Sequence, residues 1–388
     1  MLAPYLRRIT SNDQYIPELD GLRFIAIFMV IFCHINELLF NAGQFQYTDG
    51  IENYSVLNDW MKHGYFGVDI FFAISGFILA LPFAKKFREN PDFPSLKTYF
   101  IRRLTRLEPP YIISLIVMYV ILVFILELKT NDVLLPSFFS SLFYVHNFCY
   151  GREVFPLLNN VIWSLEVEVQ FYILAPFILF GLYKFKKYRK WILIFFIFLI
   201  SGVSKFWKPE FYSLYEYFHF FLIGILLVEI YLDQKQVEFQ KNSMLVALGS
   251  IPLFFAFFIG IKLTDITYLG KISDGYKLFL SSIQLLLFIA FFYLTLVKKW
   301  WPLFFQNTTV CILGGMCYSL YLVHNPVISG LGYYFFNRYH DNYFYKTYQL
   351  YFPYLLTAVI LMGLMFYVLV ERPTMKKNWW KRKQKNPL

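Results

Sequence analysis

The sequence predicts an all-α fold: a polytopic membrane helical bundle of about ten transmembrane helices with both termini in the cytoplasm. Of its 388 residues, 58% are hydrophobic and only 16% are charged, which is more apolar surface than a soluble protein of this length can bury. Most Lys and Arg residues also fall in the connections that this topology places inside. The net charge of +11 therefore reflects topology and anionic lipid, and no nucleic-acid partner is expected.

Ten apolar segments are each long enough to cross a hydrocarbon core of about 30 Å. They are residues 22–40, 64–84, 109–128, 160–183, 191–207, 211–232, 243–261, 278–297, 307–331 and 350–370. A further apolar segment, 134–148, is short and contains His146 and Asn147, so it is predicted to be re-entrant or interfacial. Tryptophans stand at or near the predicted segment ends, as in an aromatic belt.

Two units follow from this pattern. Residues 1–371 form one integral membrane domain, and residues 372–388 form a basic cytoplasmic tail that is attracted to membrane lipid. The first apolar run has no small-residue cleavage site, which indicates a retained helix. The four cysteines show no Cys-x-x-Cys spacing and three lie inside predicted spans, so neither a disulfide framework nor a metal site is predicted.

Within the first span, Arg23 and His34 are separated by ten residues. Helical geometry brings them to nearly the same face, about 16 Å apart along the axis, with His34 roughly 18 Å into the bilayer. An ionisable side chain at this depth indicates function by default. The alternative is structural, with Arg23 anchored among headgroups and His34 bonded to a neighbouring helix. For the pair together we favour function.

The basic loop after the second span ends in Arg103 and Arg106, which share a helix face at the i, i+3 spacing. Paired guanidinium groups suit bidentate phosphate contacts, so a cytosolic phosphorylated cosubstrate is predicted. Most basic cytoplasmic loops only obey topology, and this interpretation is kept for the lysines of the same loop. Arg103 and Arg106 are better candidates because they adjoin the start of a span.

The fourth predicted span opens with Trp163 and carries Glu166, Glu168 and Gln170 within an apolar run. Such carboxylates either pair with a cation or line a wet cavity. One of them could orient the imidazole of His34. A structural ion pair to another helix is the alternative for either glutamate.

The candidates for substrate contact or structural support are Trp163 and residues of two further segments. Asp69 lies near the outer end of the second span, with Ser75 and Gly76 deeper. Gly76 is predicted to allow close helix packing, and Ser75 has no local elbow that would activate a nucleophile. In the ninth segment, Tyr321 and His324 precede Asn325-Pro326, which can kink the helix and open a polar pocket. His324 is either a second site residue or a helix–helix hydrogen bond, and the latter is slightly favoured.

These segments together resemble the acyltransferase-three family of multi-span membrane O-acyltransferases. The resemblance covers nearly the whole chain and rests on six motifs in order: Leu19–Ala26 with His34, Phe71–Phe77, Arg103–Arg106 with Pro109, Trp163 through Glu168 to Tyr172, Tyr318–His324, and Glu371–Pro373. Glu166 has no obvious counterpart in the family pattern. Glu168 is therefore the carboxylate to which the resemblance assigns the family's role.

The resemblance implies transfer of an acyl group, usually acetyl, from cytosolic acyl-CoA to a sugar hydroxyl of a surface glycan such as O-antigen (lipopolysaccharide), capsule or exopolysaccharide. It implies that Arg23 and His34 are essential and that Arg103 and Arg106 serve the donor. His34 is expected to act as general base or to carry the acyl group briefly. Some relatives carry a fused extracytoplasmic domain, so a separate partner is a further expectation. The expected location is a bacterial inner or plasma membrane.

Two other classes of function remain open at this stage. A secondary transporter or flippase for an anionic or lipid-linked sugar would also suit ten spans with intramembrane Glu and His and a proline-interrupted helix. A non-catalytic scaffold that binds lipid-linked glycans would tolerate changes at Arg23 and His34.

Overall fold

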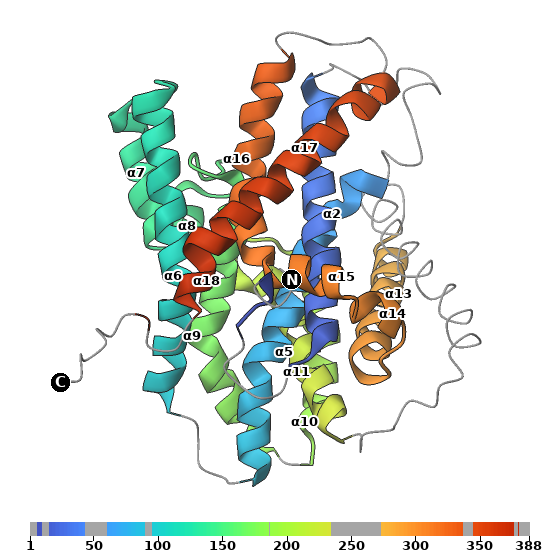
Figure 1. Ribbon diagram of the computed structural model, residues 1–388. Coiled ribbons are helices and arrows are strands. Elements are labelled where there is room, and N and C mark those ends of the chain that lie inside the picture. The colour runs from blue at the N-terminus through green and yellow to red at the C-terminus, as the bar shows by residue number, and fades with distance from the viewer. Residues whose placement is uncertain are drawn as a thin grey trace, which may run out of the picture.

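The computed structural model describes residues 6–9, 15–42, 60–89, 95–185, 187–233, 273–336, 344–375 and 379, and every regular element in these residues is a helix (Figure 1). The long helices are α2 (Pro17–Ala42), α5 (Phe66–Glu89), α6 (Leu96–Val120), α9 (Trp163–Lys184), α10 (Arg189–Phe206), α11 (Leu214–Asp233), α13 (Asp274–Phe292), α16 (Cys317–Phe336) and α17 (Phe344–Phe366). Shorter ones are α7 (Asn131–Leu142), α8 (His146–Tyr150), α14 (Pro302–Phe305), α15 (Thr308–Gly315) and α18 (Arg372–Thr374). Short 3-10 turns precede α5 and α9, and π-turns follow α6, α13 and α17.

Seven helices in the described residues are long and apolar enough to cross a membrane, and a bent pair, α15 with α16, raises the number to eight. The chain is therefore a multi-pass membrane protein, and eight of the ten predicted segments correspond to these helices. Of the other two, segment 243–261 lies outside the described residues. Segment 191–207 corresponds to α10, whose charged residues Arg189, Lys190 and Lys205 leave an uncharged stretch of only about 21 Å between them.

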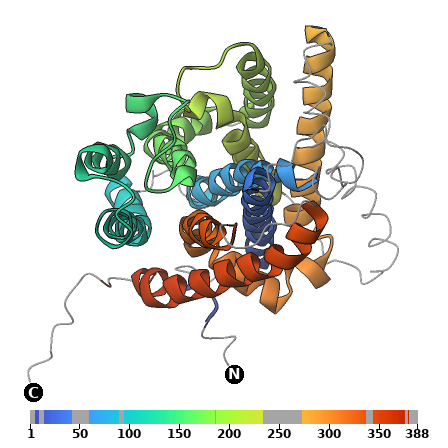
Figure 2. The same cartoon turned by 90° about the horizontal axis from the view of Figure 1, so that it is seen from above.

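Helix α2 lies at the centre of the bundle, as the view from above shows (Figure 2). It packs against α5, α15, α16 and α17, and its residues Leu22, Ile27, Ile31 and Ile35 are fully buried. Helices α6 and α7 lie at one edge of the bundle and α13 at another. The central place of α2 brings its polar residues into the protein interior, where an ionisable group needs protein partners.

The short apolar segment 134–148 forms α7 and α8. With 12 residues, α7 is only about 18 Å long and cannot cross the hydrocarbon core. The two helices are held from inside: the Tyr111 hydroxyl donates to the Ser141 carbonyl at 2.8 Å, and Glu166 accepts from the backbone N–H groups of His146 and Asn147 at 3.1 and 2.8 Å.

The ninth predicted segment is broken at a place that the sequence did not predict. Its two helices, α15 and α16, meet at a bend of 68° between Gly315 and Cys317, whereas Pro326 lies inside α16. The bend lies where Gly314 packs against α2, since a Cβ atom there would lie 1.7 Å from the Asp20 carbonyl oxygen. Close backbone approach therefore accompanies the bend, and proline does not cause it.

Gly76 packs helix against helix, as its small size predicted. A Cβ atom at Gly76 would lie 2.2 Å from the Phe221 carbonyl oxygen of α11, and one at Gly224 would lie 2.1 Å from the Ala73 carbonyl oxygen of α5. The two glycines thus allow α5 and α11 to touch backbone to backbone.

We expect Gly76→Ala to destabilise the protein by about 1–3 kcal/mol, the usual cost of overpacking a close contact. Gly181→Ala in α9 is the matched control, because nothing lies within 4 Å of its Cβ position and alanine favours a helix. Thermal unfolding in detergent would measure both. Equal stability of the two variants would contradict this account of the α5–α11 contact.

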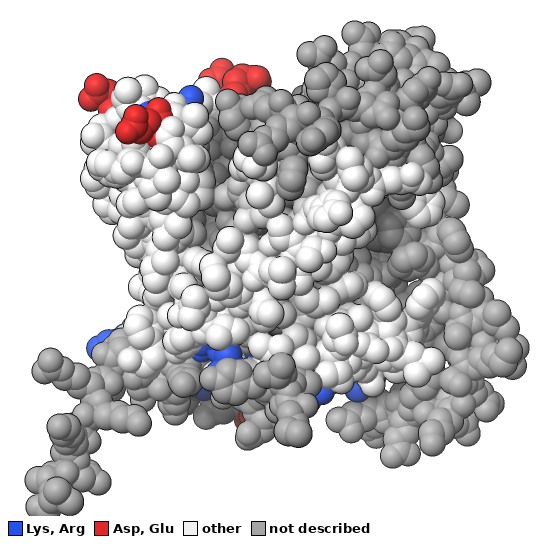
Figure 3. All heavy atoms as spheres, turned by 45° about the horizontal axis from the view of Figure 1, so that its top comes forward, with Lys and Arg blue, Asp and Glu red and all other residues white. Residues whose placement is uncertain are grey.

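The two ends of the bundle differ in charge. In Figure 3 most of the visible acidic side chains lie at one end and most of the visible basic side chains at the other. The basic end includes Lys86 and Arg88 at the end of α5, Lys184 at the end of α9 and Arg189 at the start of α10. Basic residues at one end follow the positive-inside pattern.

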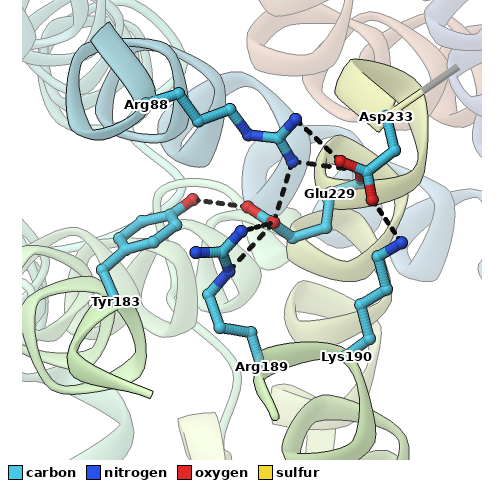
Figure 4. Close-up of polar contacts among 6 residues, drawn as sticks. All are labelled: Arg88, Tyr183, Arg189, Lys190, Glu229 and Asp233. Atoms are coloured by element: carbon cyan, nitrogen blue, oxygen red, sulfur yellow. Dashed lines mark hydrogen bonds and ion pairs between the residues drawn. The ribbon is translucent and has the colours of Figure 1, made fainter. Parts of the chain in front are cut away.

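An ion-pair cluster at the basic end ties α5, α9, α10 and α11 together around Glu229, whose side chain is fully buried (Figure 4). Glu229 accepts from Arg88 at 3.0 Å, from Arg189 at 2.8 Å and from the Tyr183 hydroxyl at 3.0 Å. Asp233 lies farther out and pairs with Arg88 at 2.8 Å and with Lys190.

Removing the buried carboxylate should cost much more than removing the exposed one. We expect Glu229→Ala to lower the free energy of unfolding by about 3 kcal/mol, the lower end of the range for breaking a buried pair, because Arg88 and Arg189 keep some access to water. Asp233→Ala, whose side chain is 42% exposed, should cost less than about 1 kcal/mol. Chemical unfolding of both variants in detergent would test the difference, and similar losses would refute it.

Candidate active site

A cavity of about 120 Å³ lies among α2, α5, α6, α9 and α16, beside the bend after α15. Four arginines line it: Arg8, Arg23, Arg103 and Arg106. Two carboxylates, Glu168 and Glu371, and the hydroxyls of Ser75, Ser164, Tyr172, Tyr318 and Tyr321 line it as well. We call this space the arginine cavity.

Arg23 is held by an acidic residue one helical turn before it. Its guanidinium donates to Asp20, and the same carboxylate lies 3.5 Å from Arg8. Burial, together with the nearby charges of Arg23 and Arg106, lowers the pKa of Arg8 to about 9. Arg8 therefore remains mostly protonated at neutral pH. Crowded cations of this kind favour an anion.

Arg103 and Arg106 reach the cavity from α6, as their shared helix face predicted. The Arg103 guanidinium lies 5.3 Å from the centre of the Tyr172 ring, a cation–π distance. The Tyr172 backbone carbonyl in turn accepts from the Tyr99 hydroxyl at 2.9 Å. Arg106 is near enough to Arg23 and Arg103 to be repelled by both. Four arginines thus face three carboxylates, Asp20, Glu168 and Glu371.

Glu168 and Ser75 form a bonded pair across the cavity. The Ser75 hydroxyl on α5 donates to the Glu168 carboxylate on α9. This contact accounts for a polar serine deep in an apolar helix, since a buried hydroxyl needs a partner. Ser75 therefore positions Glu168.

Glu371 closes the cavity from the C-terminal side. It lies in the π-turn Tyr367–Glu371, and its carboxylate accepts from the Ser319 backbone N–H at 3.0 Å and from the Ser319 hydroxyl at 2.5 Å. The glutamate thereby joins the turn after α17 to the start of α16.

His34 lies beyond the arginine cavity, next to His324. The centres of the two imidazole rings are 5.3 Å apart, and the His324 ring lies 5.5 Å from the ring of Tyr321, which lines the cavity. The Tyr321 hydroxyl lies 2.6 Å from Ser164 Oγ. Tyr321 and His324 of α16 therefore form a chain of ring contacts from the cavity that Arg23 lines to His34, in addition to the direct path along α2.

The two histidines differ in their surroundings. The His34 side chain is 27% exposed, whereas His324 is fully buried. His324 Nδ1 lies 2.8 Å from the Tyr321 carbonyl oxygen, so this nitrogen carries the proton and Nε2 has a free lone pair. His324 Nε2 has no hydrogen-bond partner in the described part of the chain.

The carboxylate beside His34 is Glu37, and the expectation that Glu166 or Glu168 orients this imidazole is wrong. His34 Nδ1 lies 3.3 Å from Glu37 Oε2, one helical turn away. Glu166 instead accepts from the backbone of α8, and Glu168 from Ser75. The carboxylate that contacts His34 thus comes from the same helix, three residues away, and not from α9.

The remaining sequence candidates divide between two places. Arg23, Ser75, Arg103, Arg106, Glu168 and Tyr321 line the arginine cavity. Asp69 and Trp163 line a second, larger cavity on the other side of Val68, which borders both.

Three residues at this site were not singled out from the sequence: Arg8 and Glu371, which line the arginine cavity, and Asp20, which pairs with Arg23. Asp20 precedes Arg23 by three positions, and this i, i+3 spacing was a usable signal. Glu371 stood in a quoted motif without an assigned role. Arg8 precedes the first helix, and no local pattern indicated that it folds back against Asp20.

A helical bundle with several spans and a cluster of arginines in an internal cavity defines a polytopic membrane protein with a cationic interior site. The chain belongs to an acyltransferase family, since the family model described as an acyltransferase domain matches residues 16–380.

Several curated proteins are similar to this chain. One relative is a protein of Staphylococcus aureus (strain COL) that is provisionally named an O-acetyltransferase. It is 30% identical to this chain over 81% of this chain and 51% of its own length. The O-acetyltransferase OatA of S. aureus (strain NCTC 8325) is 27% identical over 95% of this chain and 58% of its own. The peptidoglycan O-acetyltransferase OatA of Listeria monocytogenes is 31% identical over 48% of this chain and 28% of its own. The chain thus spans about half the length of the first two relatives, and no solved structure matches it.

Proposed function

We propose that this chain is a membrane O-acyltransferase that moves an acyl group from cytosolic acyl-CoA to a hydroxyl of a cell-surface glycan. The proposed acyl group is acetyl. The observation that carries the proposal is the convergence of four arginines from three segments on one cavity, with Tyr321 linking that cavity to the His34–His324 pair. The family match and the O-acetyltransferase names of the relatives support the same reaction class.

The donor enters from the basic end of the bundle. Arg103 and Arg106 bind phosphate groups of acyl-CoA, for which forked guanidinium groups are well suited. A cavity of about 120 Å³ is too small for the nucleotide head of the donor. Only the acyl-thioester tip of the narrow pantetheine arm enters it and advances toward Tyr321.

His34 moves the proton in the transfer step. As general base, its imidazole takes the proton of the acceptor hydroxyl while the hydroxyl oxygen bonds to the thioester carbonyl carbon. The carbon–sulfur bond then breaks, and the proton passes from the imidazolium to the CoA sulfur. In the two-step variant, His34 itself carries the acyl group between donor and acceptor. In either route, Glu37 holds the Nδ1 side of the ring.

The acceptor approaches from the end opposite the basic one. The positive-inside pattern assigns the basic end to the cytoplasm, and the opposite end then faces the outside of a bacterial inner or plasma membrane. Acceptor classes include O-antigen, capsule and exopolysaccharide, together with peptidoglycan, which the name of the Listeria relative contains. A separate extracytoplasmic protein could finish the delivery to the glycan.

The direct test supplies radiolabelled acetyl-CoA to inverted membrane vesicles with and without the chain. We expect label in isolated glycan only when the chain is present. Absence of label in every glycan fraction, with the protein intact and folded, would overturn the proposal.

One structural feature favours a second candidate, a transporter or flippase. Helices α15 and α16 form a broken span with a bend of 68° beside a polar cavity, and discontinuous helices are common at transporter binding sites. Transport would move the sugar substrate across vesicles without consuming acyl-CoA, and the same vesicle preparation distinguishes the two reactions.

A further inference from the structure

A second cavity, of about 350 Å³, lies among α5, α9, α10, α11 and α13. Asp69 near the start of α5, Glu216 near the start of α11 and Ser204 near the end of α10 all line it. The opposite ends of these three helices carry the Glu229 cluster. The second cavity therefore lies toward the end of the bundle away from the basic one.

The lining combines aromatic rings with charges of both signs. The ring of Trp163 lies 4.5 Å from that of Tyr212 and 5.6 Å from that of Tyr217. Arg152 pairs with Glu216 at 2.5 Å and lies 4.4 Å from the centre of the Tyr212 ring. Asp69, only 7% exposed, lies near Lys205. This mixture offers hydrogen-bond donors, acceptors and apolar faces together.

A buried hydroxyl on the α13 side of the second cavity lacks a hydrogen-bond partner among the described residues. Ser281 of α13 lines the cavity and is only 7% exposed. Its Oγ has no hydrogen-bond partner among the residues that the structure describes. Buried hydroxyls in folded proteins are nearly always bonded, so this wall of the cavity contains a polar group whose hydrogen-bonding capacity is unsatisfied among the described residues.

We propose that the second cavity binds a saccharide unit. A sugar presents hydroxyls that both donate and accept, and it presents C–H faces that pack on aromatic rings. A lipid tail would form no polar contact with Asp69 or with the Arg152–Glu216 pair. The cations Arg152, Lys205 and Lys208 are largely offset by the carboxylates Asp69 and Glu216, so the lining is not specialised for a multiply charged anion. The polar groups among aromatic walls are typical of small-molecule sites.

The position of this cavity suggests what the saccharide belongs to. Val68 lines both cavities, and Trp163 of the second is followed in sequence by Ser164 of the first. Building on the proposed function, we infer that the cavity holds one sugar of the acceptor glycan, apart from the sugar whose hydroxyl reacts at His34. Such a contact would govern acceptor affinity.

The test measures saccharide binding to the full chain in lipid nanodiscs by saturation-transfer difference NMR, without acyl-CoA. The probes are chitobiose, cellobiose and maltose. We expect at least one disaccharide to bind. Ser281→Phe, which fills the cavity, should weaken its binding at least tenfold, and the nearly isosteric Asp69→Asn should weaken it severalfold. Ser282→Phe is the matched control, because Ser282 lies outside the cavity and its hydroxyl already donates to the Leu278 carbonyl at 2.8 Å.

Each outcome decides the matter. Failure of all three disaccharides to bind the unmodified chain would overturn the inference and leave the cavity to water. Equal binding by Ser281→Phe and Ser282→Phe, both monodisperse, would also overturn it. Because this binding requires neither acyl-CoA nor His34, loss of the saccharide site would leave the proposed transfer reaction standing. Failure of that reaction would likewise leave a measured saccharide affinity intact.

Discussion

Replacement of His34 by Ala should abolish acyl transfer while leaving acyl-CoA binding nearly unchanged. The imidazole lies beside Glu37 and His324 and lies outside the lining of the arginine cavity, so the donor site should survive its loss. A positioned general base contributes about 10²–10⁴-fold to a rate, and transfer should fall by at least that factor. Glycan acetylation and equilibrium acetyl-CoA binding would be measured on the same preparation.

His34→Gln and Cys33→Ala make this test sharper. Glutamine keeps a polar side chain at the position but cannot take a proton, so His34→Gln should be as inactive as the alanine variant. Cys33→Ala changes the neighbouring residue on α2, whose thiol donates to the Lys62 carbonyl at 3.3 Å, and should remain active. Unchanged acetylation by both His34 variants would reject its role in proton transfer.

The second large effect is expected at Arg106, where alanine should weaken acetyl-CoA binding. A hydrogen bond to a charged group contributes about 1.5–3 kcal/mol, which corresponds to about a tenfold to hundredfold rise in Kd. The Kd of Arg106→Lys for acetyl-CoA should lie between that of the unmodified chain and that of Arg106→Ala, because an ammonium group keeps the charge but loses the bidentate geometry. At saturating donor, the transfer rate of Arg106→Ala should recover in large part.

Arg102→Ala is the matched control for this experiment. Arg102 lies on the same helix and is exposed, whereas Arg103 and Arg106 line the cavity. Binding titrations at low and high salt should show a weaker salt dependence for Arg106→Ala than for Arg102→Ala. Equal loss in both variants would mean that general basic charge of the loop, and not the cavity, attracts the donor.

Hydropathy predicted most spans well, because length and apolar content decide whether a helix can cross a membrane. Failures arose where tertiary contact overrides local pattern. Pro326 marked a plausible kink, yet the bend lies between Gly315 and Cys317, close to Gly314, where α15 meets the backbone of α2. No local signal distinguishes a glycine that touches another helix from one that faces lipid.

The site shows the same limit. The shared face of Arg103 and Arg106 was predictable from spacing, and both side chains do reach one cavity. The partners of Arg23 and His34 were not sought close by, although both lie three positions away, at Asp20 and Glu37. Arg8 joins the cavity from a segment without regular pattern, so only the folded structure could place it.

The contact of Gly314 with the Asp20 carbonyl joins segments nearly 300 residues apart. During synthesis the N-terminal helix enters the bilayer first, carrying Arg23 and Asp20 long before Gly314, Cys317 and Glu371 emerge from the ribosome. The arginine cavity therefore cannot close on a nascent chain. The complete cavity forms late in biogenesis, when the last third of the polypeptide has been inserted, so an incompletely synthesised molecule would lack the arginine cavity.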